Sequence, residues 1–194
     1  MKKNKSSASP DIPQLEAELE RENYKRRYRR VIRSTLYTLV VTAAVAVLVA
    51  TIFLPVLRIY GNSMTPTLVE GDIVVSVKGS SFKTGDIVGV YYGSKILVKR
   101  VIAGAGDWVD IDAGGNVTVN SKPIDEPYVS EKALGECNIE LPFQVPDNAF
   151  FVMGDHRKTS IDSRNTSVGS IDRDDVVGRI IFRVWPLKKF GGLK

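Results

Sequence analysis

A long uncharged stretch near the N-terminus dominates the hydrophobic pattern of this chain. Residues 34–57, STLYTLVVTAAVAVLVATIFLPVL, form a run of 24 residues without a charged side chain. As an α-helix this run would be about 36 Å long, which exceeds the roughly 30 Å of a bilayer's hydrocarbon core. A cleaved signal peptide would have a shorter apolar region, of about 7–15 residues, closer to the start of the chain. The pattern therefore predicts an uncleaved transmembrane anchor helix over residues 34–57.

The residues before this anchor are polar and highly charged. Residues 1–15 contain two prolines and several serines, a composition typical of disorder. Residues 14–33 have helix-forming composition, and their charge changes from acidic to basic along the segment. Two interpretations stay open for this segment: a short helix at the membrane face with its arginines near anionic lipid, or a charged helix surrounded by solvent.

The remainder of the chain, residues 58–194, has the pattern of a β domain. Short β-branched runs alternate with Gly, Asn, Asp and Pro, which are typical of turns. The intervals between these runs are too short for crossover helices, so antiparallel pairing is expected. The fold class is therefore mainly β, an antiparallel sheet domain preceded by one transmembrane helix. The predicted strands are 72–77, 86–92, 95–102, 108–111, 116–119 and 176–185.

The net charge of +5 comes entirely from the N-terminal segment. Residues 1–33 hold 10 Lys and Arg and 5 Asp and Glu, whereas residues 58–194 hold 17 of each. A basic tail beside an apolar run indicates topology, and it places residues 1–33 in the cytoplasm and residues 58–194 outside. The neutral remainder has no basic stripe with interleaved aromatic residues, so no nucleic-acid partner is expected.

Cysteine and histidine are almost absent, which narrows the possible chemistry. Cys137 is the only cysteine, so no internal disulfide can form, and its polar neighbours indicate a bystander thiol. A zinc site is not expected without a Cys/His cluster, and no cofactor is implied. His156 is the only histidine, so a Ser/His/Asp triad would have a single possible base.

A candidate nucleophile follows directly after the anchor. Ser63 lies in the turn-rich sequence GNSMTPTL, residues 61–68, which predicts an exposed loop or a short turn. An ordinary polar loop serine is the simpler interpretation of such a residue. Its position a few residues beyond the membrane exit favours the functional interpretation only modestly.

A candidate base lies in the predicted strand 95–102. Alternation along a strand places Lys99 on the same face as Leu97 and Val101, with Arg100 on the other face. An ammonium group among apolar neighbours is desolvated, which lowers its pKa. At the ordinary pKa of about 10.4, only about one lysine in 2,500 is neutral at pH 7, whereas a drop of roughly two to three units gives a usable general base. A lysine that snorkels at a sheet edge is the alternative.

A third segment, residues 154–164 with the sequence GDHRKTSIDSR, is dense in polar groups and follows the apolar FFVM. Asp162 and Arg164 are two residues apart, so in extended chain they face the same way and can pair. Ser160 supplies a hydroxyl that can hold an amine. A solvated loop is the alternative, although a loop after a core strand is a favoured place for function.

These segments together resemble the bacterial type I signal peptidases, which are membrane-anchored Ser/Lys proteases. SMTPTL resembles the nucleophile box of that family, KRVIAGAGD (99–107) its lysine box, and GDHRKTSIDSR its third box. EGDIV (70–74) and VGRIIFRVWP resemble the connecting segment and the closing strand. The resemblance covers the anchor and essentially all of residues 58–194, and it implies a catalytic domain of signal-peptidase type.

The resemblance also implies roles for individual residues. Ser63 matches the family's nucleophile, Lys99 its general base, and Ser160 the serine that orients the lysine amine. The matched supporting residues are the ion pair Asp162 and Arg164 and the neighbour of the base, Arg100. The residues matched to pockets for small substrate side chains are Ile59, Met64 and Leu97.

Two departures from the family pattern concern the site. His156 stands where the family usually has Asn, and we interpret it as structural because Lys99 is present in its own box. Gly61 occupies a place where some members carry a hydroxyl for the oxyanion hole. The backbone N–H of Ser63 would then supply more of that stabilisation.

The resulting hypothesis is a serine endopeptidase that removes signal peptides from secreted preproteins through an acyl-enzyme. Its expected partners are the lipid bilayer and preproteins with small residues at positions −1 and −3, the A-x-A pattern. One alternative is a related Ser/Lys processing protease with a narrow substrate. The other is a membrane-tethered, β-rich binding module without catalysis.

Overall fold

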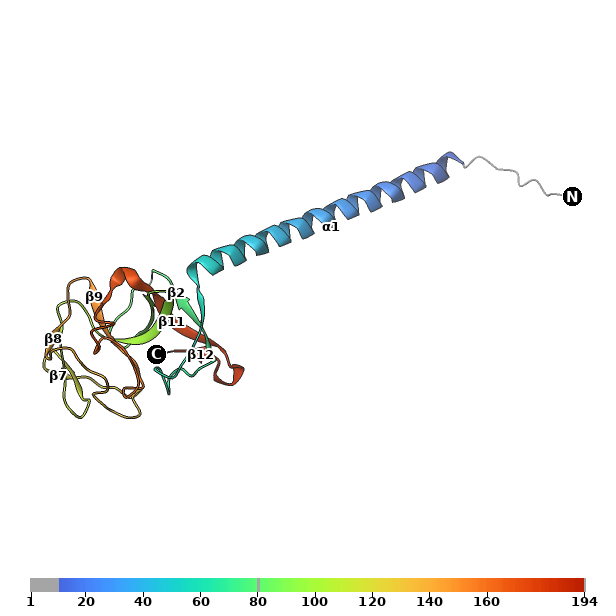
Figure 1. Cartoon of the computed structure of the whole chain (residues 1–194). Helices are drawn as coiled ribbons and strands as arrows, with labels where there is room; N and C mark the ends of the chain where they lie inside the picture. Colours follow the sequence, from blue (N-terminus) through green and yellow to red (C-terminus); the bar gives the residue numbers. More distant parts are fainter. Residues whose placement is uncertain (1–10, 80, 194) are drawn as a thin grey trace. The chain divides into compact units, whose positions relative to one another are not determined.

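The protein is described by a computed structural model that covers residues 11–79 and 81–193. It divides into two compact units, Met1–Val49 and Ala50–Lys194, which are described separately below. The first consists of helical chain in its described part, and the second contains the strands (Figure 1).

One helix, α1, contains both the charged segment and most of the apolar run. It spans Ile12–Phe53, and none of its residues is buried against the rest of the chain. Asp11 precedes it, and the Asp11 carboxylate accepts a hydrogen bond from the Ile12 N–H at 3.1 Å. Pro13 is tolerated because the first turn of a helix needs no donor at that position. By length and composition, α1 is the one helix among the described residues that is able to cross a membrane.

The boundaries of α1 differ from the sequence-based expectation at both ends. Residues 12–15 were expected to be disordered and instead form the start of the helix, while residues 1–10 lie outside the described part of the chain. The anchor helix was predicted to continue to residue 57, but α1 ends at Phe53. Pro55 explains the earlier end, because it lacks an N–H group and excludes the helical conformation from the residue before it.

The second unit contains two antiparallel sheets. The larger has the strand order β1-β2-β11-β3-β4-β9-β10, with β12 paired to β11, and the smaller has the order β7-β6-β5-β8. The strands of the larger sheet are β1 Val56–Arg58, β2 Ile73–Val77, β3 Ile87–Tyr92, β4 Lys95–Ala103, β9 Ala149–Met153, β10 Ile171–Asp172, β11 Val176–Trp185 and β12 Gly191–Gly192. Those of the smaller sheet are β5 Trp108–Ile111, β6 Val117–Val119, β7 Lys122–Pro123 and β8 Phe143–Gln144. Two 3₁₀ turns, η1 Arg173–Asp175 and η2 Leu187–Lys189, flank β11.

The predicted fold class is confirmed: the protein is mainly antiparallel β with one long apolar helix before the sheets. All six predicted strands are present, each within about one residue of its expected bounds. The strands that were not predicted are two or three residues long, apart from β9. So short a run carries no alternation that a sequence pattern can detect.

Apolar residues join the two sheets and fix the candidate nucleophile loop. One buried cluster contains Ile102 of β4, Phe151 of β9 and Val109 of β5, so it packs the small sheet against the large one. A second cluster contains Met64 and Leu68 of the loop together with residues of β2, β3 and β11. Burying two such side chains holds the loop that carries Ser63 onto the large sheet.

We expect Leu68→Ala to lower the free energy of unfolding by about 2–5 kcal/mol, because Leu68 is 0% exposed and its removal leaves a cavity beneath the loop. Chemical denaturation in detergent, followed by tryptophan fluorescence, measures the change. Leu187→Ala is the control, since Leu187 is 69% exposed and its truncation should cost no more than about 0.5 kcal/mol. Equal losses in the two variants would contradict the packing described for the loop.

Candidate active site

Ser63 lies in the loop between β1 and β2, and backbone hydrogen bonds close this loop at its base. The Ile59 N–H donates to the Asp72 carbonyl at 2.8 Å, and the Gly71 N–H donates to the Ile59 carbonyl at 2.9 Å. Ser63 itself is half-buried. Its carbonyl oxygen accepts a hydrogen bond from the His156 N–H at 3.0 Å, so the loop is attached to the segment 154–164.

Lys99 is buried in the middle of the large sheet. It lies in β4 opposite Val88 of β3 and is 3% exposed. Its Nζ donates a hydrogen bond to Ser160 Oγ at 2.9 Å. Burial lowers the pKa of Lys99 from 10.5 to about 8, while Asp162 and Asp155 act to raise it and Arg164 to lower it. The neutral amine is therefore far more populated at neutral pH than in an ordinary lysine.

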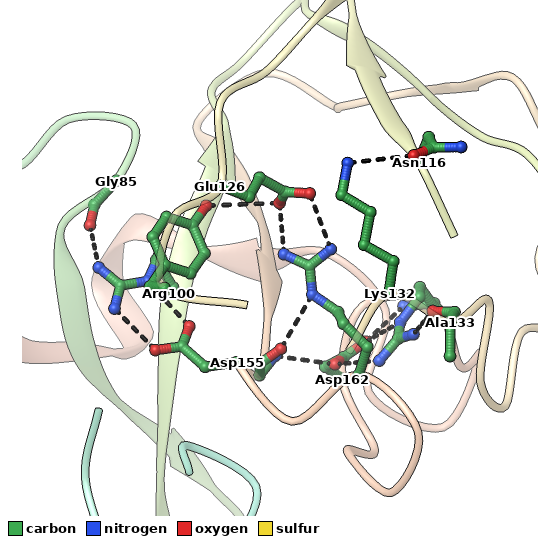
Figure 2. A network of polar contacts seen from close by, with 12 residues as sticks. Gly85, Arg100, Asn116, Glu126, Lys132, Ala133, Asp155 and Asp162 are labelled. Atoms are coloured by element: carbon green, nitrogen blue, oxygen red, sulfur yellow. Dashed lines mark hydrogen bonds and ion pairs between the residues drawn. The ribbon is translucent and has the colours of Figure 1, made fainter. Parts of the chain in front are cut away.

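Arg100, on the opposite face of β4, is buried as completely as Lys99. Its guanidinium group donates to both carboxylate oxygens of Asp155, from Nε at 2.8 Å and from Nη2 at 2.7 Å. Nη1 donates to the Gly85 carbonyl at 2.7 Å, and Figure 2 shows Arg100 between these two partners. The sequence pattern predicted that Lys99 and Arg100 lie on opposite faces of the strand. It did not indicate that both faces of β4 are buried at these two residues.

The segment 154–164 brings Ser160, Asp162 and Arg164 together in the interior. Arg164 binds the Asp162 carboxylate in a bidentate manner, from Nε and from Nη2, both at 2.8 Å. Burial acts to raise the pKa of Asp162, but Arg164, the Gly154 N–H and the Ser160 hydroxyl together hold that pKa below its ordinary value. Ser160 Oγ, which accepts the hydrogen bond from Lys99, therefore lies close to an ionised Asp162.

Gly154 is a position whose role the sequence analysis missed. A Cβ atom there would lie 2.3 Å from Ser160 Oγ and 2.5 Å from the Ser63 carbonyl oxygen. No side chain fits in that space, so glycine allows the Ser63 backbone and the Ser160 hydroxyl to lie next to each other. The GD pair that opens the third box is the sequence signal for this position.

A small cavity adjoins Ser63. Its volume is about 80 Å³, and the three residues expected to form substrate pockets all line it. The lining residues are Ser63 with Ile59, Met64 and Leu97, together with Arg58, Tyr60, Gly61, Ile96 and Val98. Met64 and Ile59 are buried, so the inner wall of this cavity is fixed by the core.

His156 lies at the edge of this arrangement. Its imidazole Nδ1 is 2.8 Å from Thr159 Oγ1 of its own loop, and its backbone N–H donates a hydrogen bond to the Ser63 carbonyl.

Cys137 is a half-buried free thiol. Within residues 11–79 and 81–193, no group of three or more His, Cys, Asp and Glu is placed to hold a metal ion.

Comparison with known proteins adds independent information. The model of a family described as signal peptidase, peptidase S26, matches residues 32–185. Signal peptidase I of Bacillus licheniformis is 37% identical over 153 residues, which cover 72% of this chain and 81% of that protein. Signal peptidase IB of Staphylococcus aureus strain COL is 35% identical over 154 residues, which cover 68% of this chain and 78% of that protein.

A solved signal peptidase I of Enterococcus faecalis aligns with 52% of this chain and 97% of its own, at 22% identity and a TM-score of 0.42. The family match extends from Ile32, two residues before the apolar run, to the end of β11. With relatives similar over most of its length, the chain belongs to the signal peptidase family, peptidase S26, as a type I signal peptidase.

Proposed function

We propose that this serine protease, which removes signal peptides from secretory preproteins, works through a dyad of Ser63 and Lys99. The observation that carries the proposal is the state of Lys99: it is buried, its Nζ is held by Ser160 at 2.9 Å, and its pKa is lowered to about 8 by burial. A buried lysine without such a task would be an unfavourable feature of a small β domain.

The proposed reaction follows from these groups. The neutral Lys99 amine takes the proton of Ser63 as Oγ attacks the carbonyl carbon of the last signal-peptide residue. The peptide C–N bond breaks, the proton passes from Lys99 to the leaving amine, and an ester joins the signal peptide to Ser63. Lys99 then takes a proton from water, whose oxygen attacks the ester, and Ser63 regains its proton.

Ser160 orients the amine in this scheme. A neutral amine has two N–H donors and one lone pair. In the structure the Ser160 oxygen accepts a hydrogen bond from Lys99 Nζ at 2.9 Å. One N–H is thereby fixed, which restricts the direction of the lone pair. Stabilisation of the oxyanion falls to backbone donors such as the Ser63 N–H, since Gly61 has no hydroxyl.

The cavity beside Ser63 supports a preference for small substrate side chains. A small cavity of about 80 Å³ with walls from Ile59, Met64 and Leu97 fits small side chains such as that of alanine. Substrates with the A-x-A pattern before the cleavage site fit this description. The walls from Ile59 and Met64 favour selection by exclusion, because these two side chains are buried and cannot move without disturbing the core.

The anchor helix holds the enzyme at the membrane. The chain is membrane-anchored through α1, and the arginines before the apolar run favour a cytoplasmic N-terminus with residues 58–194 outside. The lipid bilayer is then a partner as well as a support. Enzyme and membrane-bound preprotein share one plane, which raises their effective concentration.

We expect Ser63→Ala and Lys99→Ala each to lower kcat/KM for a signal-bearing preprotein at least about a thousandfold, because each removes one half of the dyad. His156→Asn is the matched control and should stay within about threefold of wild type. Cleavage of purified precursor, followed on gels and by mass spectrometry of the product, measures the rates. Activity that survives both alanine variants rules out the dyad, and a wild-type protein that cleaves no preprotein favours the binding module.

The dyad also predicts the pH dependence of cleavage. The base must be neutral, and a lysine is neutral above its pKa, so kcat/KM should rise about tenfold per pH unit below a pH of about 8 and level off above it. Steady-state rates between pH 6 and pH 10 test this profile. A rising limb that disappears in His156→Asn would identify the histidine as the base.

Cavity size predicts a specificity change. The wild type should cleave a precursor with Ala at −1 and reject the same precursor with Val at −1, whereas Leu97→Ala should raise the Val-to-Ala ratio of kcat/KM at least about tenfold. Val56→Ala serves as control because Val56 is exposed on β1 and lies outside the cavity lining. An unchanged ratio in Leu97→Ala would mean that this cavity does not receive the −1 side chain.

A further inference from the structure

The segment after β7, Glu126–Tyr128, reaches from the small sheet to two buried arginines of the active-site region. We propose that Glu126 and Tyr128 are positioning residues for the cleavage reaction: by holding Arg157 and Arg100, they fix Gly154 and Ser160 against Lys99. The proposal rests on the proposed function, since it assumes that Lys99 and Ser160 take part in catalysis. Neither residue belongs to the boxes that the sequence identified.

Glu126 forms the first contact. Its carboxylate receives both Nη groups of Arg157, with Oε2 at 3.2 Å from Nη1 and Oε1 in close contact with Nη2. Both side chains are fully buried. The Tyr128 hydroxyl also hydrogen-bonds to Glu126 Oε1, at 3.4 Å. The carboxylate is therefore the point at which the segment 126–128 is attached to the third box.

Arg157 connects Glu126 to the site. Its Nε donates to the Gly154 carbonyl at 3.1 Å, while the Gly154 N–H donates to Asp162 Oδ2 at 2.9 Å. Both backbone polar groups of Gly154, the N–H and the carbonyl, are thus held by buried side chains. Because Gly154 lies against Ser160 Oγ and the Ser63 carbonyl, a displacement of Gly154 moves the groups on which Lys99 depends.

Tyr128 forms the second contact. The Arg100 guanidinium carbon lies 3.8 Å from the centre of the Tyr128 ring, a cation–π arrangement. The same guanidinium holds Asp155, the residue after Gly154, and Asp155 Oδ2 also accepts the Thr67 hydroxyl at 2.5 Å. Figure 2 draws both the Arg100–Asp155 pair and the contacts of Glu126.

Fold stability alone does not account for this arrangement. A buried ion pair is weak evidence for stability, because desolvation opposes the attraction of the charges. The contacts from Glu126 and Tyr128 instead converge on Gly154 and Asp155, the two residues that open the third box. A role in holding the site predicts an effect on the titration of Lys99, whereas a role in the fold alone does not.

The direction of that effect separates two causes. The charged groups that act on Lys99 are Asp162 and Asp155, which raise its pKa, and Arg164, which lowers it. If Glu126 acted only as a charge, its loss would leave Arg157 uncompensated and lower the pKa of Lys99 further. If Glu126 holds the packing, its loss admits water to Lys99 and raises the pKa toward its ordinary value.

The test uses Glu126→Gln in the full chain in detergent. We expect kcat/KM to fall about 10- to 100-fold, mainly in kcat, and the apparent pKa of the pH profile to rise by about half a unit or more. Direct NMR titration of the Lys99 amine in wild type and variant should show the same upward shift. An unchanged pKa, or a downward shift, would overturn the positioning role.

Tyr128 provides a second and milder variant. Tyr128→Phe keeps the ring over Arg100 and should retain activity within about threefold, whereas Tyr128→Leu removes the ring and should lower kcat at least about tenfold. Equal activities of the Phe and Leu variants would exclude the ring contact. This pair keeps the proposal testable if Glu126→Gln fails to fold.

Val109→Ala is the matched control. Val109 is buried in β5 of the small sheet, and it belongs to the apolar cluster that packs this sheet against β4 and β9. The substitution should lower thermal stability without moving the pKa of Lys99. A shift in this control equal to that in Glu126→Gln would reduce the role of Glu126 to fold stability. Failure of the dyad is recognised separately, by cleavage activity that survives in Lys99→Ala. The NMR titration of Lys99 tests the positioning role whether or not Lys99 is the catalytic base.

Discussion

The desolvation of one amine is the constraint on which the rest of the catalytic domain depends. A charged ammonium buried as deeply as Lys99 would cost several kcal/mol, and the lowered pKa means that the neutral form relieves much of this cost. The two carboxylates near the amine would cancel this effect if they were free. Each is instead bound by a buried arginine, Asp162 by Arg164 and Asp155 by Arg100. The local charges are therefore paired with each other, and burial remains the largest influence on Lys99.

Much of the fold followed from the sequence, because its signals are local. β-branched runs with turn residues between them located six strands, and a run of 24 uncharged residues located the membrane helix. The end of that helix was misplaced because the apolar pattern continues beyond Pro55, whereas the backbone restriction imposed by proline does not allow the helix to continue. Strands such as β7 and β10 form only because longer partners pair with them, and no local pattern encodes such a partner.

The candidate site was predictable to a different extent. Lys99, Ser160 and the pair Asp162–Arg164 lie in segments whose sequences resemble known boxes, and the structure brings these four residues together. Glu126 gave no such signal, because its partner Arg157 lies 31 residues further along the chain and an isolated glutamate before a proline is an ordinary loop residue. Tertiary contacts of this kind have no periodicity, so only a structure can identify them.

The burial of Arg100 depends in part on the segment that follows the small sheet. A strand that carries a desolvated amine on one face must also be shielded on the other, since water beside the backbone would loosen the strand and reach the amine. Arg100 occupies that second face, and Asp155, the Gly85 carbonyl and the Tyr128 ring satisfy its charge and its donors. Tyr128 lies in the segment that follows β7, so the chain leaving the small sheet supplies this ring. The Arg100–Asp155 ion pair and the Tyr128 ring, whose residues lie far from Ser63 in sequence, thereby contribute to the environment in which Lys99 can lose its proton.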